Sequence, residues 1–175
     1  MRLFVALLFP ETVKDALRDA ALELKDHASY GVFSRRENFH LTLSFLGEVR
    51  DPRPVKRAMA AAAAGAVPFD LELDRPGRFR RQGGDIWWVG LKTAPELTEL
   101  HRRLSDALQT EGFPGEDRAF RPHVTLGRQV TLTDPAFRLQ VPGLTIPARE
   151  ICLMRSQRLQ GVLTYTCLHR EPLQG

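Results

Sequence analysis

Two short segments of the sequence place a histidine and a threonine two positions apart. They are His40-Leu41-Thr42-Leu43 and His123-Val124-Thr125-Leu126, which share the pattern His-x-Thr-Leu. Residues two positions apart on a β-strand project from the same face, roughly 6.5–7 Å from each other. Each segment would therefore present one imidazole and one hydroxyl together. A lone histidine on a strand is usually structural, but two copies of the full pattern favour a functional interpretation.

Paired imidazoles and hydroxyls are suited to phosphoryl transfer. An imidazole titrates near neutral pH, so one histidine can accept a proton while the other donates one. The attacking and leaving oxygens lie on opposite sides of phosphorus, which a cleft with one histidine on each wall would match. The threonine hydroxyls would hold the non-bridging oxygens. We therefore expect catalytic roles for His40 and His123, and phosphate contacts from Thr42 and Thr125.

Other chemistries fit the sequence less well. Each motif supplies one imidazole and no carboxylate at zinc-ligand spacing, so we expect no metal site. The sequence holds no glycine-rich loop of the P-loop or Rossmann type, and we expect no cofactor. Ser44 is the only serine near either motif and Cys152 lies in an apolar strand, which disfavours nucleophilic catalysis. The other three histidines are interpreted as solvated or structural: His27, His101 and His169.

The order strand, helix, strand occurs twice along the chain and ends each time in one of the motifs. Leu3 lies 37 positions before His40, and Ile86 lies 37 positions before His123. Equal spans that end in the same motif indicate an internal duplication. The six expected elements are Arg2–Phe9, Pro10–His27, Asn38–Gly47, Asp85–Leu91, Thr93–Gly112 and Arg121–Arg128.

The remaining segments complete one catalytic domain over residues 1–175, in two lobes of about 1–80 and 81–175 with room for strand exchange between them. In the first part of the chain we expect a polar loop at Ser29–Glu37, a helix packed on the first sheet at Pro54–Ala64, and a strand at Phe69–Leu73. A basic loop at Arg75–Gly84 is expected between the lobes. The second lobe is expected to contain strands at Leu144–Ile146 and Glu150–Arg155 and a closing strand at Gly161–His169.

Composition excludes several classes of protein. Hydrophobic residues make up 43% and charged residues 26% of the chain, which excludes disordered, collagen-like and coiled-coil proteins. No apolar run reaches the length of a membrane span, and the apolar start Met1–Pro10 is interpreted as a buried strand rather than a signal peptide. Two cysteines are too few for a disulfide framework, so Cys152 and Cys167 are expected to be reduced core residues of a cytoplasmic protein.

The basic residues are unusual in kind. Four lysines and 21 arginines give a net charge of +4. Codon usage is the favoured explanation for this excess of arginine; the functional alternative is that arginine forks match phosphate oxygens. A net charge of this size favours polyanionic partners only weakly.

The two motifs in their context resemble the signature motifs of the 2H phosphoesterase superfamily. The segments Arg2–Leu7, Phe39–Gly47 and Phe120–Arg128 are similar to its LigT/ThpR branch, the RNA 2′,3′-cyclic phosphodiesterases first described as 2′-5′ RNA ligases. The resemblance extends over essentially the whole chain. Its C-terminal part rests on Leu153–Ser156, Gly161, Tyr165 and Pro172-Leu173.

This resemblance implies an α+β fold, a bilobal pseudo-symmetric duplication with two antiparallel sheets facing a central cleft and helices outside. It implies metal-free hydrolysis of RNA 2′,3′-cyclic phosphate to a 2′-phosphomonoester, with reversible 2′-5′ ligation in some members. His40 would then protonate the departing 3′ oxygen and His123 would activate water, while Thr42 and Thr125 hold phosphate oxygens. The nearly symmetric motifs do not by themselves say which histidine is the acid.

Further contacts are expected from three places. Arg128 belongs to the family's Thr-Leu-Gly-Arg run and would contact the nucleotide, although strand alternation turns it away from His123 unless the chain bends after Gly127. Phe9 would stack on a base, but core packing is the favoured interpretation. Arginines 78, 80 and 81 would either guide the RNA backbone or form a solvated hairpin.

Two alternatives remain open at this stage. The arginine excess and the basic loop would also suit an RNA-binding module with vestigial catalysis. Within the superfamily, ADP-ribose 1″,2″-cyclic phosphate or a 2′,5′-linked oligonucleotide would serve as the main substrate by the same chemistry. The expected partner is an RNA with a 2′,3′-cyclic phosphate end or a cyclic nucleotide, with no membrane, no obligate protein partner and a monomeric state.

Overall fold

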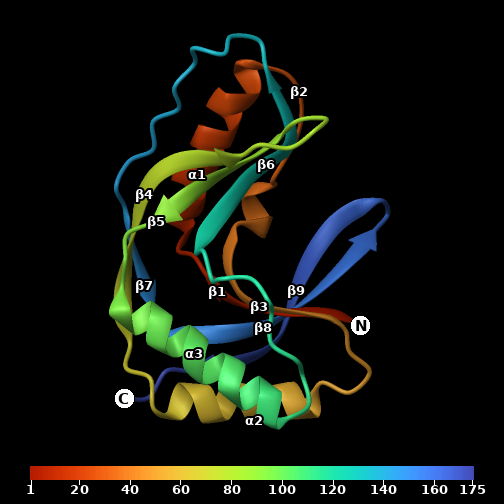
Figure 1. The fold of residues 1–175 in the computed structure, drawn as a ribbon, viewed down its shortest axis with the longest axis vertical. Helices are drawn as coiled ribbons and strands as arrows, with labels where there is room; N and C mark the ends of the chain where they lie inside the picture. The colour runs from red at the N-terminus through yellow and green to blue at the C-terminus, as the bar shows by residue number, and fades with distance from the viewer.

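The computed structural model describes all 175 residues as two antiparallel sheets with helices on their outer sides (Figure 1). The first sheet has the strand order β3-β1-β8-β9 and the second the order β2-β6-β5-β4-β7. The predicted α+β fold is confirmed. The strands are β1 (Arg2–Leu8), β2 (Ala28–Phe33), β3 (His40–Glu48), β4 (Phe69–Phe79), β5 (Asp85–Leu91), β6 (His123–Leu132), β7 (Thr145–Ala148), β8 (Glu150–Leu159) and β9 (Val162–Pro172).

Strand alternation separates the two faces of the first sheet. On β1, Leu3 and Val5 belong to the main core of 38 buried residues, whereas Phe4 and Ala6 belong to a small second cluster. Successive residues on a strand point to opposite faces, so the second cluster lies on the face turned away from the main core. The main core also contains Val89 of the second sheet, which makes it a single core for both sheets.

Three amphipathic helices cover the sheets, namely α1 (Glu11–Asp26), α2 (Arg53–Ala64) and α3 (Pro95–Thr110). Helix α1 packs on β2 and β6 of the second sheet, while α2 and α3 pack against each other below the first sheet (Figure 1). The predicted helix Pro54–Ala64 and its place on the first sheet are confirmed. None of the helices combines the length and the apolar character needed to cross a membrane.

The prediction of a polar loop over Ser29–Glu37 is wrong. This segment contains most of β2 and a short 3-10 turn at Arg36–Asn38. Strand β2 is an edge strand that pairs only with β6, and the side chains of Tyr30 and Val32 are 59% and 55% exposed. An edge strand that buries so little side-chain surface need not alternate between apolar and polar residues, so no periodicity marks it in the sequence.

The assignment of Glu150–Arg155 to the second lobe is also wrong, because β8 pairs with β1 in the first sheet. The expected strand Leu144–Ile146 does join the second sheet, as β7. Each sheet thus combines strands from both halves of the chain, and a boundary near residue 80 does not separate the sheets. Hydrophobic pattern identifies a strand but does not identify its partner, since pairing depends on distant segments.

The basic loop between the lobes is shorter than the expected Arg75–Gly84. Strand β4 continues to Phe79, which pairs with Ile86 of β5, so only residues 80–84 form the turn. A register shift between Leu73 and Pro76 accommodates the proline within the strand. Proline is tolerated in strands at such bulges because the bulged residue need not donate to the ladder.

Candidate active site

His40 is the first residue of β3, and hydrogen bonds fix its ring at both nitrogens. Its Nδ1–H donates to the carbonyl oxygen of Asn38 at 2.7 Å, and the Thr42 hydroxyl donates to Nε2 at 2.8 Å. A carbonyl oxygen can only accept, so the neutral ring carries its proton on Nδ1. The nitrogen available for chemistry is therefore Nε2, on the face that carries Thr42.

His123 is held in the same way at the start of β6. Its Nδ1–H donates to the carbonyl oxygen of Arg121 at 2.6 Å, again two residues earlier in the chain. Its Nε2 has no hydrogen-bond partner in the protein, which leaves this nitrogen free. In the register of β5 and β6, His123 lies opposite Gly90 and Thr125 lies opposite Trp88, so both motif residues share one face of the second sheet.

The two imidazoles lie within electrostatic reach of each other, one on each sheet. Burial lowers the pKa of His40 below its usual value of 6.5, and the positive charge of His123 lowers it further; the hydrogen bond to the Asn38 carbonyl opposes both effects. A neighbouring like charge disfavours protonation only when it is close. The fold therefore brings together the two motifs that are 83 residues apart in the sequence, and His40 is neutral at pH 7 in the free protein.

Aromatic rings surround His40 on the face of the first sheet that is turned away from the main core. Its ring centroid lies 4.9 Å from that of Phe4 and 5.2 Å from that of Tyr165, which meets it edge-on. Burial raises the pKa of the Tyr165 hydroxyl, and the charges of Arg128 and Arg2 act in the opposite direction. The ring of Tyr165 thus packs against the half-buried imidazole, and its raised pKa favours the neutral hydroxyl.

His123 also lies among aromatic rings. Its centroid is 5.4 Å from that of Phe79, which meets it edge-on, and 6.4 Å from that of Trp88. Gly77 makes room for the indole, because a Cβ atom at this position would lie 2.3 Å from Trp88. The second sheet thereby presents an aromatic wall next to the histidine.

Strand β6 is irregular at Arg128, just after its motif. The register of β5 and β6 shifts on both sides of Trp87, and Gln129 has a positive φ of 54°. Such bulges change which face a side chain occupies. The charge of the exposed Arg128 lowers the pKa of Tyr165 on the other sheet, so its guanidinium lies within electrostatic reach of that side chain. Strand alternation alone does not predict the irregularity of β6 at this point.

The other candidate residues lie elsewhere. Phe9 is 5% exposed and belongs to the main core, which favours the packing interpretation, and its stacking on a base stays a prediction. Arg78 and Arg80 both approach the carboxylate of Asp85, at 3.6 and 3.9 Å. Burial raises the pKa of the Cys152 thiol to about 12, which makes it a poor nucleophile.

Sequence reasoning missed four residues that shape this site. Asn38 positions His40 through a backbone carbonyl, which no side-chain pattern can reveal. In the sequence, Tyr165 stands out only through its match to the family's C-terminal pattern. Phe79 and Trp88 lie in an expected loop and an expected strand, and nothing else marks them. In both motifs the residue two positions before the histidine supplies the carbonyl that anchors its ring. This shared spacing is the one feature of the sequence that could have predicted the anchoring carbonyls.

Metal-binding side chains do not gather at the two histidines. No group of three or more His, Cys, Asp or Glu side chains lies close enough together to hold a metal ion anywhere in the chain. The side chains that contact the imidazoles include the Thr42 hydroxyl at His40 and aromatic rings at both histidines.

Comparison with known proteins gives consistent results. Residues 9–160 match the family model of the 2′-5′ RNA ligase superfamily. An RNA 2′,3′-cyclic phosphodiesterase of Geobacillus stearothermophilus is 33% identical over 98% of this chain, which spans 57% of that relative's length. An RNA 2′,3′-cyclic phosphodiesterase of Thermus thermophilus is 31% identical over 100% of this chain and 91% of its own length.

Among solved structures, Escherichia coli LigT complexed with 3′-AMP superimposes on the fold with a TM-score of 0.81. The two proteins are 28% identical, and the match covers 99% of this chain and 98% of LigT. The whole fold is therefore shared with a protein that binds a nucleoside monophosphate.

Proposed function

The chain belongs to the 2′-5′ RNA ligase superfamily, and we propose that it hydrolyses RNA 2′,3′-cyclic phosphate ends to 2′-phosphomonoesters without a metal ion. One observation carries this proposal: His40 and His123, each anchored through Nδ1, lie on strands of opposite sheets that contact each other, within electrostatic reach of one another. The name shared by the relatives supports the choice of substrate.

In the proposed reaction, a water oxygen attacks phosphorus while His123 Nε2 takes its proton. The bond from phosphorus to the 3′ oxygen breaks, and His40 delivers the proton carried on its Nε2 to that oxygen. The phosphate remains on the 2′ oxygen. Thr42 and Thr125 bind the non-bridging oxygens, which requires the Thr42 hydroxyl to leave His40 Nε2 when substrate arrives.

The acid role of His40 depends on the substrate. Burial and the neighbouring imidazole lower the pKa of His40, so the free protein holds it neutral at pH 7. An anionic phosphate between the two rings favours the protonated form of an imidazole and raises its pKa. The same site would ligate RNA in a reversible reaction, with a 5′-hydroxyl of a second RNA taking the place of water and forming a 2′-5′ linkage.

The experiment uses 2′,3′-cyclic AMP in the presence of EDTA. We expect release of the 2′-monophosphate, and His40→Ala and His123→Ala should each lower kcat by about 10²–10⁴-fold because a proton-transfer group is lost. His27→Ala serves as the matched control, because this exposed ring stacks on Phe137 outside the cleft and should leave kcat unchanged. A 3′-monophosphate product, loss of activity in EDTA, or full activity of either variant would contradict the proposal.

Substrate choice is tested in the same series. ADP-ribose 1″,2″-cyclic phosphate and a 2′,5′-linked oligonucleotide are assayed beside the RNA cyclic phosphate, and we expect the highest kcat/KM for the RNA end. If RNA binds tightly but none of these substrates reacts, the chain is a binding module instead.

A further inference from the structure

A cavity of about 640 Å³ adjoins the wall that carries His123. Trp88 and Gly90 line it, and these two residues lie opposite Thr125 and His123 in the register of β5 and β6. The cavity extends from there to the first turn of α3, with β4 on one side and the segment before β6 on the other. Its volume falls within the roughly 300–1,000 Å³ typical of small-ligand pockets. We call it the α3-side pocket.

Two arginines in the α3-side pocket have no partner within the protein. Arg75 and Arg121 line the pocket, are exposed, and make no side-chain hydrogen bond or ion pair. Lys92 also lines it but is paired with Glu72 at 2.7 Å. The single acidic lining residue, Asp74, forms no ion pair either. The pocket thus holds a surplus of positive charge in two unengaged guanidinium forks, which suit a phosphate group.

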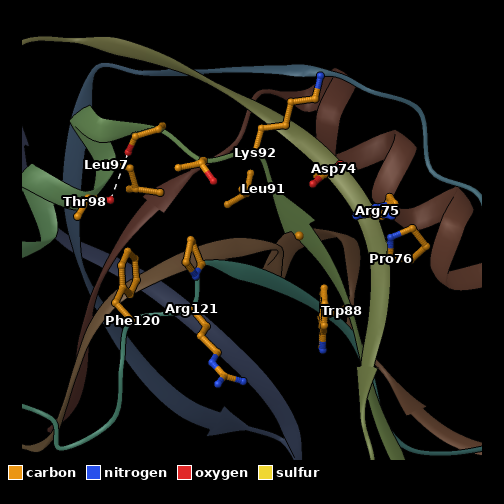
Figure 2. A pocket seen from close by; sticks show the side chains of 14 residues that line it. Asp74, Arg75, Pro76, Trp88, Leu91, Lys92, Leu97, Thr98, Phe120 and Arg121 are labelled. Carbon is orange, nitrogen blue, oxygen red and sulfur yellow. Dashed lines mark hydrogen bonds between the residues drawn. The ribbon is translucent and has the colours of Figure 1, made fainter.

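Aromatic rings supply the other half of the pocket's chemistry. Figure 2 shows Arg75 and Trp88 on one side, with Phe120 and Arg121 on the other. Phe120 is held by stacking on His101, with centroids 3.9 Å apart and planes 3° from parallel. Aromatic faces next to cationic forks are the usual means of binding single-stranded nucleic acid, because every base has a π-face and every linkage a negative charge.

We propose that the α3-side pocket binds the nucleotide that precedes the cyclic-phosphate end of an RNA, and this rests on the function proposed above. Arg75 and Arg121 take the phosphodiester that joins this nucleotide to the 5′ oxygen of the terminal ribose, and Trp88 and Phe120 contact its base. A cyclic mononucleotide lacks that phosphodiester. The pocket would therefore make the enzyme prefer an RNA end to a cyclic mononucleotide.

Arg121 also links this subsite to catalysis. Its carbonyl oxygen orients the His123 ring at 2.6 Å, while its side chain lines the pocket. Arg121 lies two residues before His123 in the chain, so its substitution would also disturb the orientation of the His123 ring. Arg75 has no bond to either histidine, and its substitution therefore tests the subsite alone.

The experiment compares kcat/KM for 2′,3′-cyclic AMP and for a diadenylate that ends in a 2′,3′-cyclic phosphate. Arg75→Gln should lower the diadenylate-to-mononucleotide ratio of kcat/KM about tenfold, because one charge-assisted contact is lost. It should also reduce the slope of log kcat/KM against log salt for the diadenylate by about 0.7, the value for one phosphate contact on a single strand. Arg118→Gln is the matched control, because this exposed arginine lies outside the pocket and its loss removes the same charge.

The possible outcomes separate the two proposals. If the unmodified enzyme hydrolyses both substrates and Arg75→Gln changes their kcat/KM equally or not at all, the subsite is wrong and the function stands. If Arg118→Gln lowers the ratio as much as Arg75→Gln does, the effect is general electrostatics and the subsite is again wrong. If the unmodified enzyme hydrolyses neither substrate, the proposed function itself fails.

Discussion

At the scale of single residues, the two histidines are similar in sequence and different in surroundings. Both donate Nδ1–H to a carbonyl two residues earlier, but only His40 has its Nε2 engaged, by Thr42. Burial lowers the pKa of His40, and the charge of His123 lowers it further. Nearly symmetric motifs therefore yield two chemically distinct imidazoles, which is what an acid and a base require.

The coupling between the imidazoles can be measured. The His123→Ala substitution removes a neighbouring positive charge, so the pKa of His40 should rise, yet stay below 6.5 because burial remains. The measurement is an NMR titration of the imidazole nitrogens from pH 4 to 9 in the unmodified protein and the variant. His27→Ala, which changes an exposed ring, should leave the His40 titration unchanged. A His40 pKa that falls or stays constant in His123→Ala would show that the two rings do not face each other.

At the scale of secondary-structure elements, a turn and a bulge shape the wall around His123. Strands β4 and β5 meet in a short turn over residues 80–84, whose last residue, Gly84, has a φ of 121°. A Cβ atom on Gly84 would lie 2.4 Å from the backbone of Gln129, which itself has a positive φ in β6. The hairpin and the irregular part of β6 therefore pack backbone against backbone at Gln129, the residue after Arg128.

Substitutions at the two turn glycines should separate backbone strain from this contact. Gly84→Ala combines an unfavourable φ with a clash against backbone, so it should lower the free energy of unfolding by more than the roughly 1–2 kcal/mol of left-handed strain alone. Gly83→Ala has a φ of 85° and open space around it, so only the strain applies. Urea denaturation of both variants checks this. If both variants lose the same free energy of unfolding, the clash between residue 84 and the Gln129 backbone does not contribute to the loss.

At the scale of the whole molecule, the two halves of the chain are interleaved. The first sheet takes β8 and β9 from the second half, and the second sheet takes β2 and β4 from the first. The helices cross over too, since α1 covers the second sheet and α3 packs below the first. A single core of 38 buried residues joins these parts. The chain therefore crosses between the two sheets several times, and these covalent connections hold the sheets in place relative to each other.

This interleaving predicts cooperative unfolding. Both tryptophans, Trp87 and Trp88, lie in the second sheet, whereas far-ultraviolet circular dichroism reports on both sheets. The midpoints of urea unfolding followed by tryptophan fluorescence and by circular dichroism should coincide, as expected of a two-state transition. An earlier transition in either signal would show that the two sheets unfold as separate units.

The sequence alone determined the two His-x-Thr motifs, their 37-residue spacing from an apolar strand, and the chemistry that two imidazoles and two hydroxyls can perform. These features are local, because side-chain alternation on a strand follows from backbone geometry. Only the tertiary structure decided which strands pair, that β8 lies beside β1, and that the register of β6 shifts where it passes Trp87. It also decided that Tyr165, Phe79 and Trp88 surround the histidines. Pairing, bulges and burial depend on contacts between distant segments, and no pattern within one segment specifies them.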